Sequence, residues 1–472
     1  MSLRRPLNLQ LLIIILLLVA SFSCRAASEL SAYSASDPTP TKPLETAQAA
    51  TPTSIPATQT PTYTPTSTLT PLPTATPTAT FTPTPPPTPS PAQLGLFEGL
   101  WSKINENYLY PDFNGLDWDK VHDEYRQRIQ AGLYMSDFYA AMEEMVQRLN
   151  DDHSFFLKPE EASDEDAEFA GENDFVGIGI LTIPVPERER ITVVLVFPGS
   201  PAERAGLRAH DSILAIDGKP VLDEKGFRRD LFIGPEGTEV EVTVQTPGEA
   251  ARQVTLIRSR VMGAIPVPWS VHTSPGGKRI GYMLIPSFSD ETIDDQVGEN
   301  LGSMAVEGEL DGLILDNRQN SGGADNVARG VLSYFTSGIQ GYFVDRNGTK
   351  RPMSVIGNGD LDSDKLDLVV LVGKDTASFG EIFSGILQDS GRAHLIGEVT
   401  DGNMELLWGY DFEDGSRAWI AHEAFLPLNH PEVDWEETGI IPERIVATNW
   451  DEVTPQTDPA MVAALEYFDA LP

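Results

Sequence analysis

The residues best suited to chemistry include Ser378, which stands where a buried strand meets a helix. Asp367–Gly373 contains the apolar run Leu368–Val372, typical of a strand buried on both faces. From Ser378 the apolar spacing becomes helical, so its hydroxyl would face the crevice beyond the carboxyl end of the strand. Backbone N–H groups of a first helical turn lack internal partners and can stabilise an oxyanion. Ser378 is therefore a candidate nucleophile; helix capping is the alternative.

A second candidate is His153, which follows two aspartates and precedes Ser154, directly after a predicted helix. A histidine can accept a proton near neutral pH, and its neighbours can tune its protonation. The alternative is an ordinary surface histidine. The seven histidines show no HExxH spacing, and the pair His422-Glu423 lacks a second histidine. We expect neither a metal nor another cofactor.

Composition restricts the class of protein. The 472 residues suffice for two or three domains. A net charge of −37 argues against nucleic acid as a partner and is compatible with a soluble domain in an extracytoplasmic space. The single cysteine, Cys24, excludes an intrachain disulfide framework and a thiolate metal cluster.

The amino-terminal residues predict export. Arg4 and Arg5 precede an apolar run, Leu11–Ala20, that has the length of a signal-peptide core. Residues 1–27 are predicted to be a signal segment, and Cys24 resembles the lipidated cysteine of a bacterial lipoprotein. Ordinary cleavage just after it and an uncleaved anchor are the alternatives. We expect an exported protein of the cell envelope, anchored to the membrane through this segment.

The following residues alternate between unfolded and folded character. Residues 28–92 are rich in Pro and Thr, cannot bury a core and predict a disordered or semi-rigid stalk. Residues 93–165 show helical spacing of apolar side chains. Residues 170–260 are β-rich, and with the segments SPAERAGL (200–207) and DSILAIDG (211–218) they closely resemble a PDZ domain. In that family the backbone of the segment matching Gly177, Ile178, Gly179 and Ile180, which we expect to open a strand, binds a peptide carboxylate.

The remaining residues predict an α/β core over 265–450 and a carboxyl-terminal helix or tail over 451–472. A buried strand leads into the loop 316–323, DNRQNSGG. Its glycine pair would let backbone N–H groups approach a ligand closely.

Four features in one order resemble the carboxyl-terminal processing (tail-specific) peptidases and their tricorn-like relatives. They are a helical segment ending in DxHS, a PDZ-like module, a DxRxNxGG loop and TASFGE at a strand-to-helix turn. The resemblance implies an α+β multidomain fold with a crotonase-like α/β spiral core, an inserted PDZ-like module and an amino-terminal helical segment. It also implies Ser378 as nucleophile, with an oxyanion hole from the backbone of Gly322 or Gly323 and of Phe379.

The chain departs from the tail-specific pattern at Asn403, where those peptidases have a lysine base. The tricorn-like branch instead takes a histidine from the helical segment and a glutamate near the end of the domain. The matching residues here are His153 and Glu436, with Glu437 as a near-equal candidate for the glutamate. Because the base must be neutral, we expect activity to fall as the pH drops through a nominal pKa near 6.5.

The sequence therefore predicts an exported serine endopeptidase that cleaves protein or peptide tails, which the PDZ-like module docks through their carboxyl termini. The alternative is an inactive relative that acts as a peptide-binding scaffold. An α/β-hydrolase is a weaker third reading, because no GxSxG elbow surrounds Ser378.

Overall fold

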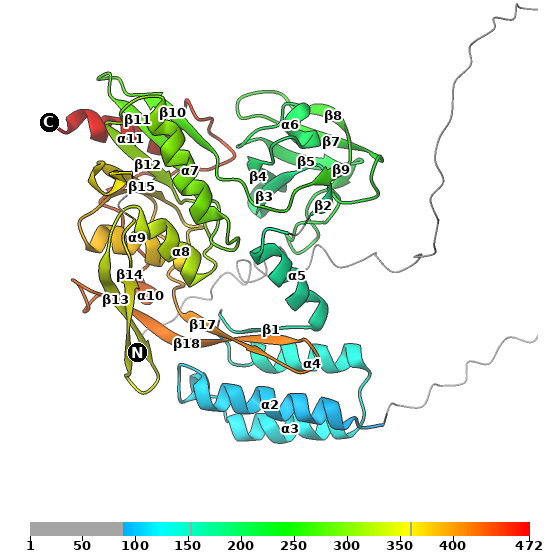
Figure 1. Ribbon diagram of the computed structural model, residues 1–472. Helices are drawn as coiled ribbons and strands as arrows, with labels where there is room; N and C mark the ends of the chain where they lie inside the picture. The colour runs from blue at the N-terminus through cyan, green and yellow to red at the C-terminus, as the bar shows by residue number, and fades with distance from the viewer. Residues whose placement is uncertain (1–87, 152, 173, 359–360) are drawn as a thin grey trace, which may run out of the picture. The chain divides into compact units, whose positions relative to one another are not determined.

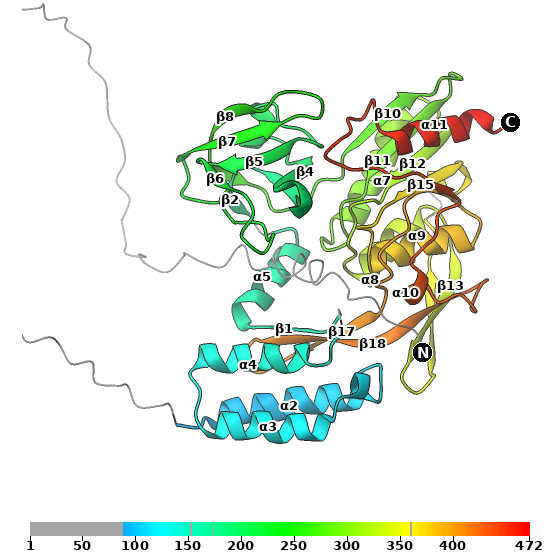
Figure 2. The ribbon, with the colours of Figure 1, turned by 180° about the vertical axis from the view of Figure 1, so that it is seen from behind.

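The computed structural model describes residues 88–472 except 152, 173, 359 and 360 (Figures 1 and 2). The predicted signal segment, Cys24 and almost all of the predicted stalk therefore lie outside the described residues. Within the described part, no helix is both long and apolar enough to cross a membrane.

The first described elements form a helical layer, as predicted. Helices α2 (Pro91–Asn107), α3 (Trp118–Gln130) and α4 (Met135–Gln147) bury one face each in a shared apolar core. A 3-10 turn, η1 (Phe113–Gly115), separates the first two. Strand β1 (Phe155–Leu157) follows α4 and pairs with β18 (Arg417–Pro427) near the far end of the chain. This pairing ties the loop between α4 and β1, which carries His153, to the second half of the chain.

A β-rich module follows α5 (Pro159–Phe169). Its main sheet has the order β3-β4-β5-β7-β8, with β6 against β5, and β2 pairs separately with β9. The strands are β2 (Phe175–Gly177), β3 (Ile180–Val185), β4 (Arg190–Val196), β5 (Ser212–Ile216), β6 (Lys219–Pro220), β7 (Glu239–Gln245), β8 (Arg252–Ile257) and β9 (Ser259–Val261). The short helices are η2 (Pro186–Arg188) and α6 (Pro201–Arg204).

One strand prediction in this module is wrong. The segment from Gly177 to Ile180 does not open a single strand, because Gly177 ends β2 and Ile180 begins β3. Between them Gly179 has a φ of +77°, and a Cβ at this position would lie 2.3 Å from the Cβ of Ser200. The close approach of Ser200 thus requires glycine and a break between the strands.

The second half of the described chain contains a sheet of order β10-β11-β12-β15-β16-β19. Only β10 runs antiparallel to its neighbour; the other pairs are parallel. The strands are β10 (Trp269–Thr273), β11 (Arg279–Leu284), β12 (Gly312–Asp316), β15 (Leu368–Val372), β16 (His394–Gly397) and β19 (Arg444–Ile445).

Helices cover both faces of this sheet, as the continuous apolar run of β15 predicts. Alternate residues of β15 enter two different apolar clusters. One cluster includes side chains of α7 (Ile293–Val306), α8 (Asp325–Ser333) and α9 (Phe379–Asp389), and the other those of α11 (Pro459–Ala470). The structure thus has the mixed α and β architecture that the sequence predicted.

A second, antiparallel sheet connects the helical layer to the core. Its order is β1-β18-β13-β14, and β17 pairs with the long strand β18. The new strands are β13 (Gly338–Asp345), β14 (Lys350–Val355) and β17 (Leu406–Asp411). The short helices η3 (Ser363–Lys365) and α10 (Trp435–Thr438) lie in the connections.

Candidate active site

Ser378 lies between β15 and α9 in a backbone conformation that serine rarely adopts. Its φ is 52° and its ψ is −128°. Such a conformation stores about 1–3 kcal/mol of strain, which proteins retain mainly at functional sites. The backbone N–H of Ser378 donates to the carbonyl of Asn403 at 2.6 Å. Within the described residues its side chain forms no capping hydrogen bond, so capping does not explain a serine here.

The glycine pair of the 316–323 loop packs directly against this serine. A Cβ on Gly322 would lie 2.6 Å from the Cβ of Ser378, and one on Gly323 would lie 2.2 Å from the carbonyl carbon of Phe288. Both glycines have positive φ, +102° and +136°. The close packing explains why this loop requires glycine at both positions.

The N–H of Gly322 is already engaged. It donates to Oδ1 of Asn320 at 2.8 Å, a contact that the sequence did not indicate. In this conformation Gly322 therefore has no N–H available for an oxyanion. Gly323 and Phe379 remain as the candidate donors.

The loop that carries His153 is fixed by the carboxylate of Asp151. One oxygen of Asp151 accepts the N–H groups of His153 and Ser154, at 3.0 and 2.6 Å. The other oxygen accepts the hydroxyl of Ser154, whose oxygen in turn accepts the N–H of Ala421 on β18. His153 is only 8% exposed, so it is not the surface histidine that the sequence left open.

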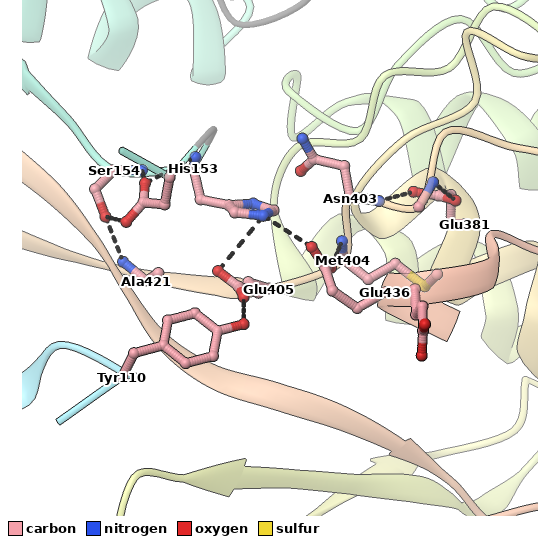
Figure 3. A network of polar contacts seen from close by, with 12 residues as sticks. Tyr110, His153, Ser154, Glu381, Asn403, Met404, Glu405, Ala421 and Glu436 are labelled. Carbon is pink, nitrogen blue, oxygen red and sulfur yellow. Dashed lines mark hydrogen bonds and ion pairs between the residues drawn. The ribbon is translucent and has the colours of Figure 1, made fainter. Parts of the chain in front are cut away.

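The imidazole of His153 points between two carboxylates (Figure 3). Its Nε2 lies 3.1 Å from Oε1 of Glu436 and 3.4 Å from Oε2 of Glu405. The other oxygen of Glu436 accepts the N–H of Met404 at 2.6 Å. The structure thus brings His153 and Glu436 together. In the described residues, however, no hydrogen bond joins His153 to Ser378.

These contacts change the protonation of His153. Burial by itself would lower the pKa, but the negative charge of Glu405 and the hydrogen bond and charge of Glu436 outweigh burial and raise the pKa to about 10. The imidazole is therefore charged at neutral pH in this conformation. The nominal pKa near 6.5 that the sequence suggested does not apply here.

Glu405 is the residue that sequence reasoning missed. It is buried, its Oε1 accepts the hydroxyl of Tyr110, and burial raises its own pKa against the lowering effect of His153 (Figure 3). It stands two residues after Asn403, where the chain departs from the lysine of the tail-specific pattern. That departure was the one sequence signal close to Glu405. The direction of its side chain depends on tertiary contacts that no motif records.

The loop containing Asn403 is held by Glu381 on α9. One carboxylate oxygen of Glu381 accepts the hydroxyl of Thr400 and the N–H of Gly402, and the other accepts the N–H of Asn403 at 2.9 Å. Burial outweighs these donors and raises the pKa of Glu381 to about 7. Since the carbonyl of Asn403 accepts the N–H of Ser378, Glu381 indirectly supports the backbone of the serine.

A cavity of about 920 Å³ opens at Ser378. Gly322, Gly323 and Glu405 line it together with residues of the β-rich module, including the run from Leu181 to Arg188. This volume is in the range of natural ligand sites and can hold several peptide residues. The serine is thus accessible from a space bordered by both the core and the β-rich module.

A smaller cavity, about 90 Å³, lies in the β-rich module. Ile178, Gly179 and Ile180 line it, whereas Gly177 does not. The aromatic rings of Phe197 and Phe232 contribute to an apolar wall. Its size suits one apolar side chain at the end of an extended peptide.

The trio of His153, Glu405 and Glu436 also has the composition of a metal site, since one ligand atom from each lies within 4.8 Å of the others. The ion pairs between the imidazole and the two carboxylates account for this grouping without an ion. We therefore assign no metal to it.

Comparison with known proteins gives consistent results along the chain. The profile of peptidase family S41 matches residues 279–446, that of the tricorn protease C1 domain matches residues 93–147, and that of the PDZ domain matches residues 192–246. The β-rich module is thus a PDZ domain.

Individual proteins match over most of their length. A carboxyl-terminal-processing protease of Synechocystis is 30% identical over 374 residues, which are 78% of this chain and 84% of the relative. Carboxyl-terminal-processing peptidase 3, chloroplastic, of Arabidopsis thaliana is 26% identical over 73% of this chain and 67% of its own. Among solved structures, a photosystem II D1 C-terminal processing protease superposes with a TM-score of 0.55 at 27% identity, covering 80% of this chain and 97% of that one.

Proposed function

Because the chain belongs to peptidase family S41, the carboxyl-terminal-processing proteases, it is a serine-type peptidase, and we propose that Ser378 is its nucleophile and His153 its general base. The observation that supports this most is the strained backbone of Ser378 against the loop of Gly322. The hydrogen bond between His153 and Glu436 supports the choice of base.

In the proposed reaction, Oγ of Ser378 attacks the carbonyl carbon of the scissile peptide bond. The hydroxyl proton passes to His153 in its neutral form, and the carbonyl electron pair moves onto the oxygen, which the N–H groups of Gly323 and Phe379 stabilise. The oxyanion electron pair then re-forms the carbonyl, and the C–N bond breaks as His153 gives its proton to the leaving amine. Water hydrolyses the ester bond of the acyl-enzyme by the same path, with His153 again as base and then acid. Glu436 orients the imidazole throughout. Asn403, which cannot accept a proton from serine, has no part in the proton transfer.

Labelling by a fluorophosphonate probe tests the nucleophile. The wild-type chain should be labelled, and Ser378→Ala should abolish labelling. Ser321→Ala is the matched control, because Ser321 lines the same cavity and should leave labelling intact. Labelling that persists in Ser378→Ala would refute the assignment of the nucleophile.

His153→Ala should reduce peptide hydrolysis about a hundredfold or more, the usual contribution of general-base catalysis.

We further propose that the PDZ domain docks the carboxyl terminus of a protein or peptide substrate. The segment of Ile178, Gly179 and Ile180 would bind the terminal carboxylate through backbone N–H groups, and the small apolar cavity would take the last side chain. Titration calorimetry of the Ser378→Ala chain with a peptide and its amidated twin tests this proposal. The free carboxylate should bind more tightly; equal affinities would mean that it is not recognised.

The amino-terminal sequence supports export and anchoring at the cell envelope, with Cys24 as the proposed lipidated residue. The second candidate function is that of a family member that has lost activity and acts as a peptide-binding scaffold, because the described residues contain no direct hydrogen bond between Ser378 and His153. The fluorophosphonate experiment separates the two, since a scaffold without a reactive serine would not be labelled.

A further inference from the structure

Glu405 reaches the proposed base from the side of the substrate cavity. Its Oε2 lies 3.4 Å from Nε2 of His153, and both side chains are almost fully buried, with 3% and 7% exposed. Charges at this distance, away from water, interact far more strongly than at the surface. None of the sequence motifs singles out this contact.

The geometry places two carboxylates in competition for one nitrogen. Glu436 also approaches Nε2, at 3.1 Å, and a single N–H donates a well-directed hydrogen bond to only one acceptor. Each carboxylate is held by its other oxygen, Glu436 by the N–H of Met404 and Glu405 by the hydroxyl of Tyr110 (Figure 3). Both are thus fixed with one oxygen aimed at the same atom.

We propose that Glu405 is a positioning residue that competes with Glu436 for Nε2 of His153 and holds the base in a charged resting form. This inference rests on the proposed function, in which His153 is the general base. Glu405 lines the same cavity as Ser378. A peptide that enters the cavity can therefore contact Glu405, weaken its hold on the imidazole and leave His153 with Glu436 alone.

The surrounding charges agree with this role. Besides Glu405 and Glu436, the groups that act on the pair are Asp151, on the loop of His153, and Tyr108 and Tyr110, on the connection after α2. Among the influences that raise the pKa of His153, the charge of Glu405 is the largest, ahead of the hydrogen bond to Glu436. The burial that opposes them would on its own keep the imidazole neutral.

Titration of His153 by NMR tests the inference without any need for hydrolysis. The full chain with Ser378→Ala is labelled with ¹⁵N-histidine, and the His153 signal is assigned by its loss in His153→Gln. Glu405→Gln should lower the titration midpoint of His153 by about one pH unit or more, because a neighbouring opposite charge is removed. Glu405→Asp keeps the charge, so its His153 midpoint should lie close to that of the chain with Glu405.

Glu423→Gln is the matched control. Glu423 is also a buried, ion-paired carboxylate, but its partner is Arg351, so its loss should leave the His153 midpoint unchanged. If Glu405→Gln does not fold, Tyr110→Phe replaces it: without the hydroxyl, Glu405 ionises less readily and the His153 midpoint should again fall. An unchanged midpoint in the folded variant would overturn the role of Glu405.

Peptide hydrolysis then separates this inference from the proposed function. With Ser378 present, the acidic limb of the pH profile of kcat/KM should move to lower pH in Glu405→Gln by the same interval as the NMR midpoint. A midpoint that moves in a protein that never hydrolyses peptides would refute the proposed function and leave the contact standing. If peptides are hydrolysed but the acidic limb of the pH profile does not move in Glu405→Gln, the positioning role is refuted.

Discussion

At the scale of single residues, the charge of His153 decides when Ser378 can lose its proton. A base must be neutral, and the structure raises the pKa of His153 to about 10. We therefore expect kcat/KM for a short peptide that leaves the resting contacts intact to rise from pH 7 toward pH 10. A profile of initial rates measures this. His430→Gln, an exposed histidine variant, should leave the profile unchanged.

A midpoint of the kcat/KM profile near 6.5 would contradict this expectation and mean that the resting ion pairs are released before chemistry.

The raised pKa of His153 also affects the stability of the fold. The charged His153 stabilises the fold fully below its ordinary pKa of 6.5, and this contribution is lost as the pH rises through about 10.

The sequence indicated some of these residues better than others. Ser378, His153 and Glu436 stand in short motifs whose order along the chain resembles a family, so they could be singled out without coordinates. Glu405 could not, because its contact with His153 joins segments whose approach only the folded chain defines. Asn320 stands in the DxRxNxGG motif, but the motif does not say that its Oδ1 accepts the N–H of Gly322, two residues further along the same loop.

At the scale of elements, the loop 316–323 and the start of α9 fit together through Gly322. An alanine there would force its Cβ to within 2.6 Å of the Cβ of Ser378 and would adopt an unfavourable φ of +102°. We expect Gly322→Ala to lower the rate of fluorophosphonate labelling about a hundredfold, since displacing a reacting group by about 1 Å can have that effect.

Gly348→Ala is the control for backbone strain alone. Gly348 lies in the turn between β13 and β14 with a φ of +77°, and a Cβ there would meet no atom within 4 Å. This variant should lose about 1 kcal/mol of stability and keep its labelling rate. Equal labelling rates in the two variants would mean that the loop does not position Ser378.

Prediction of elements succeeded where periodicity was strong. The apolar run Leu368–Val372 coincides with β15, and the helical spacing over residues 93–165 corresponds to α2, α3 and α4, because apolar spacing marks the buried faces of these elements. The strand predicted to begin at Gly177 failed because Gly179 has a positive φ imposed by the approach of Ser200. That contact lies between segments, where periodicity carries no information.

At the scale of the whole described chain, Trp450 joins the PDZ domain to the core. Its ring stacks on His210 with centroids 4.1 Å apart, and its Nε1 donates to the carbonyl of Val193 at 3.0 Å. The guanidinium of Arg318 also lies 5.0 Å from the centre of the ring. Arg318 is paired with Asp316 and lies in the 316–323 loop that reaches Ser378, so Trp450 connects the two parts next to the active site.

Trp450→Ala should therefore loosen both sides of this contact at once. Removing a buried tryptophan ring typically lowers the free energy of unfolding by about 3–5 kcal/mol. We expect faster amide hydrogen exchange both in β4 of the PDZ domain and in the 316–323 loop of the core. Trp408→Ala is the matched control: Trp408 also stacks on a histidine, His422, but is 43% exposed and lies within one sheet. It should lose less stability and leave exchange at β4 unchanged. Faster exchange in Trp450→Ala on one side only would contradict a shared role, because a ring that couples two surfaces must release both when it is removed.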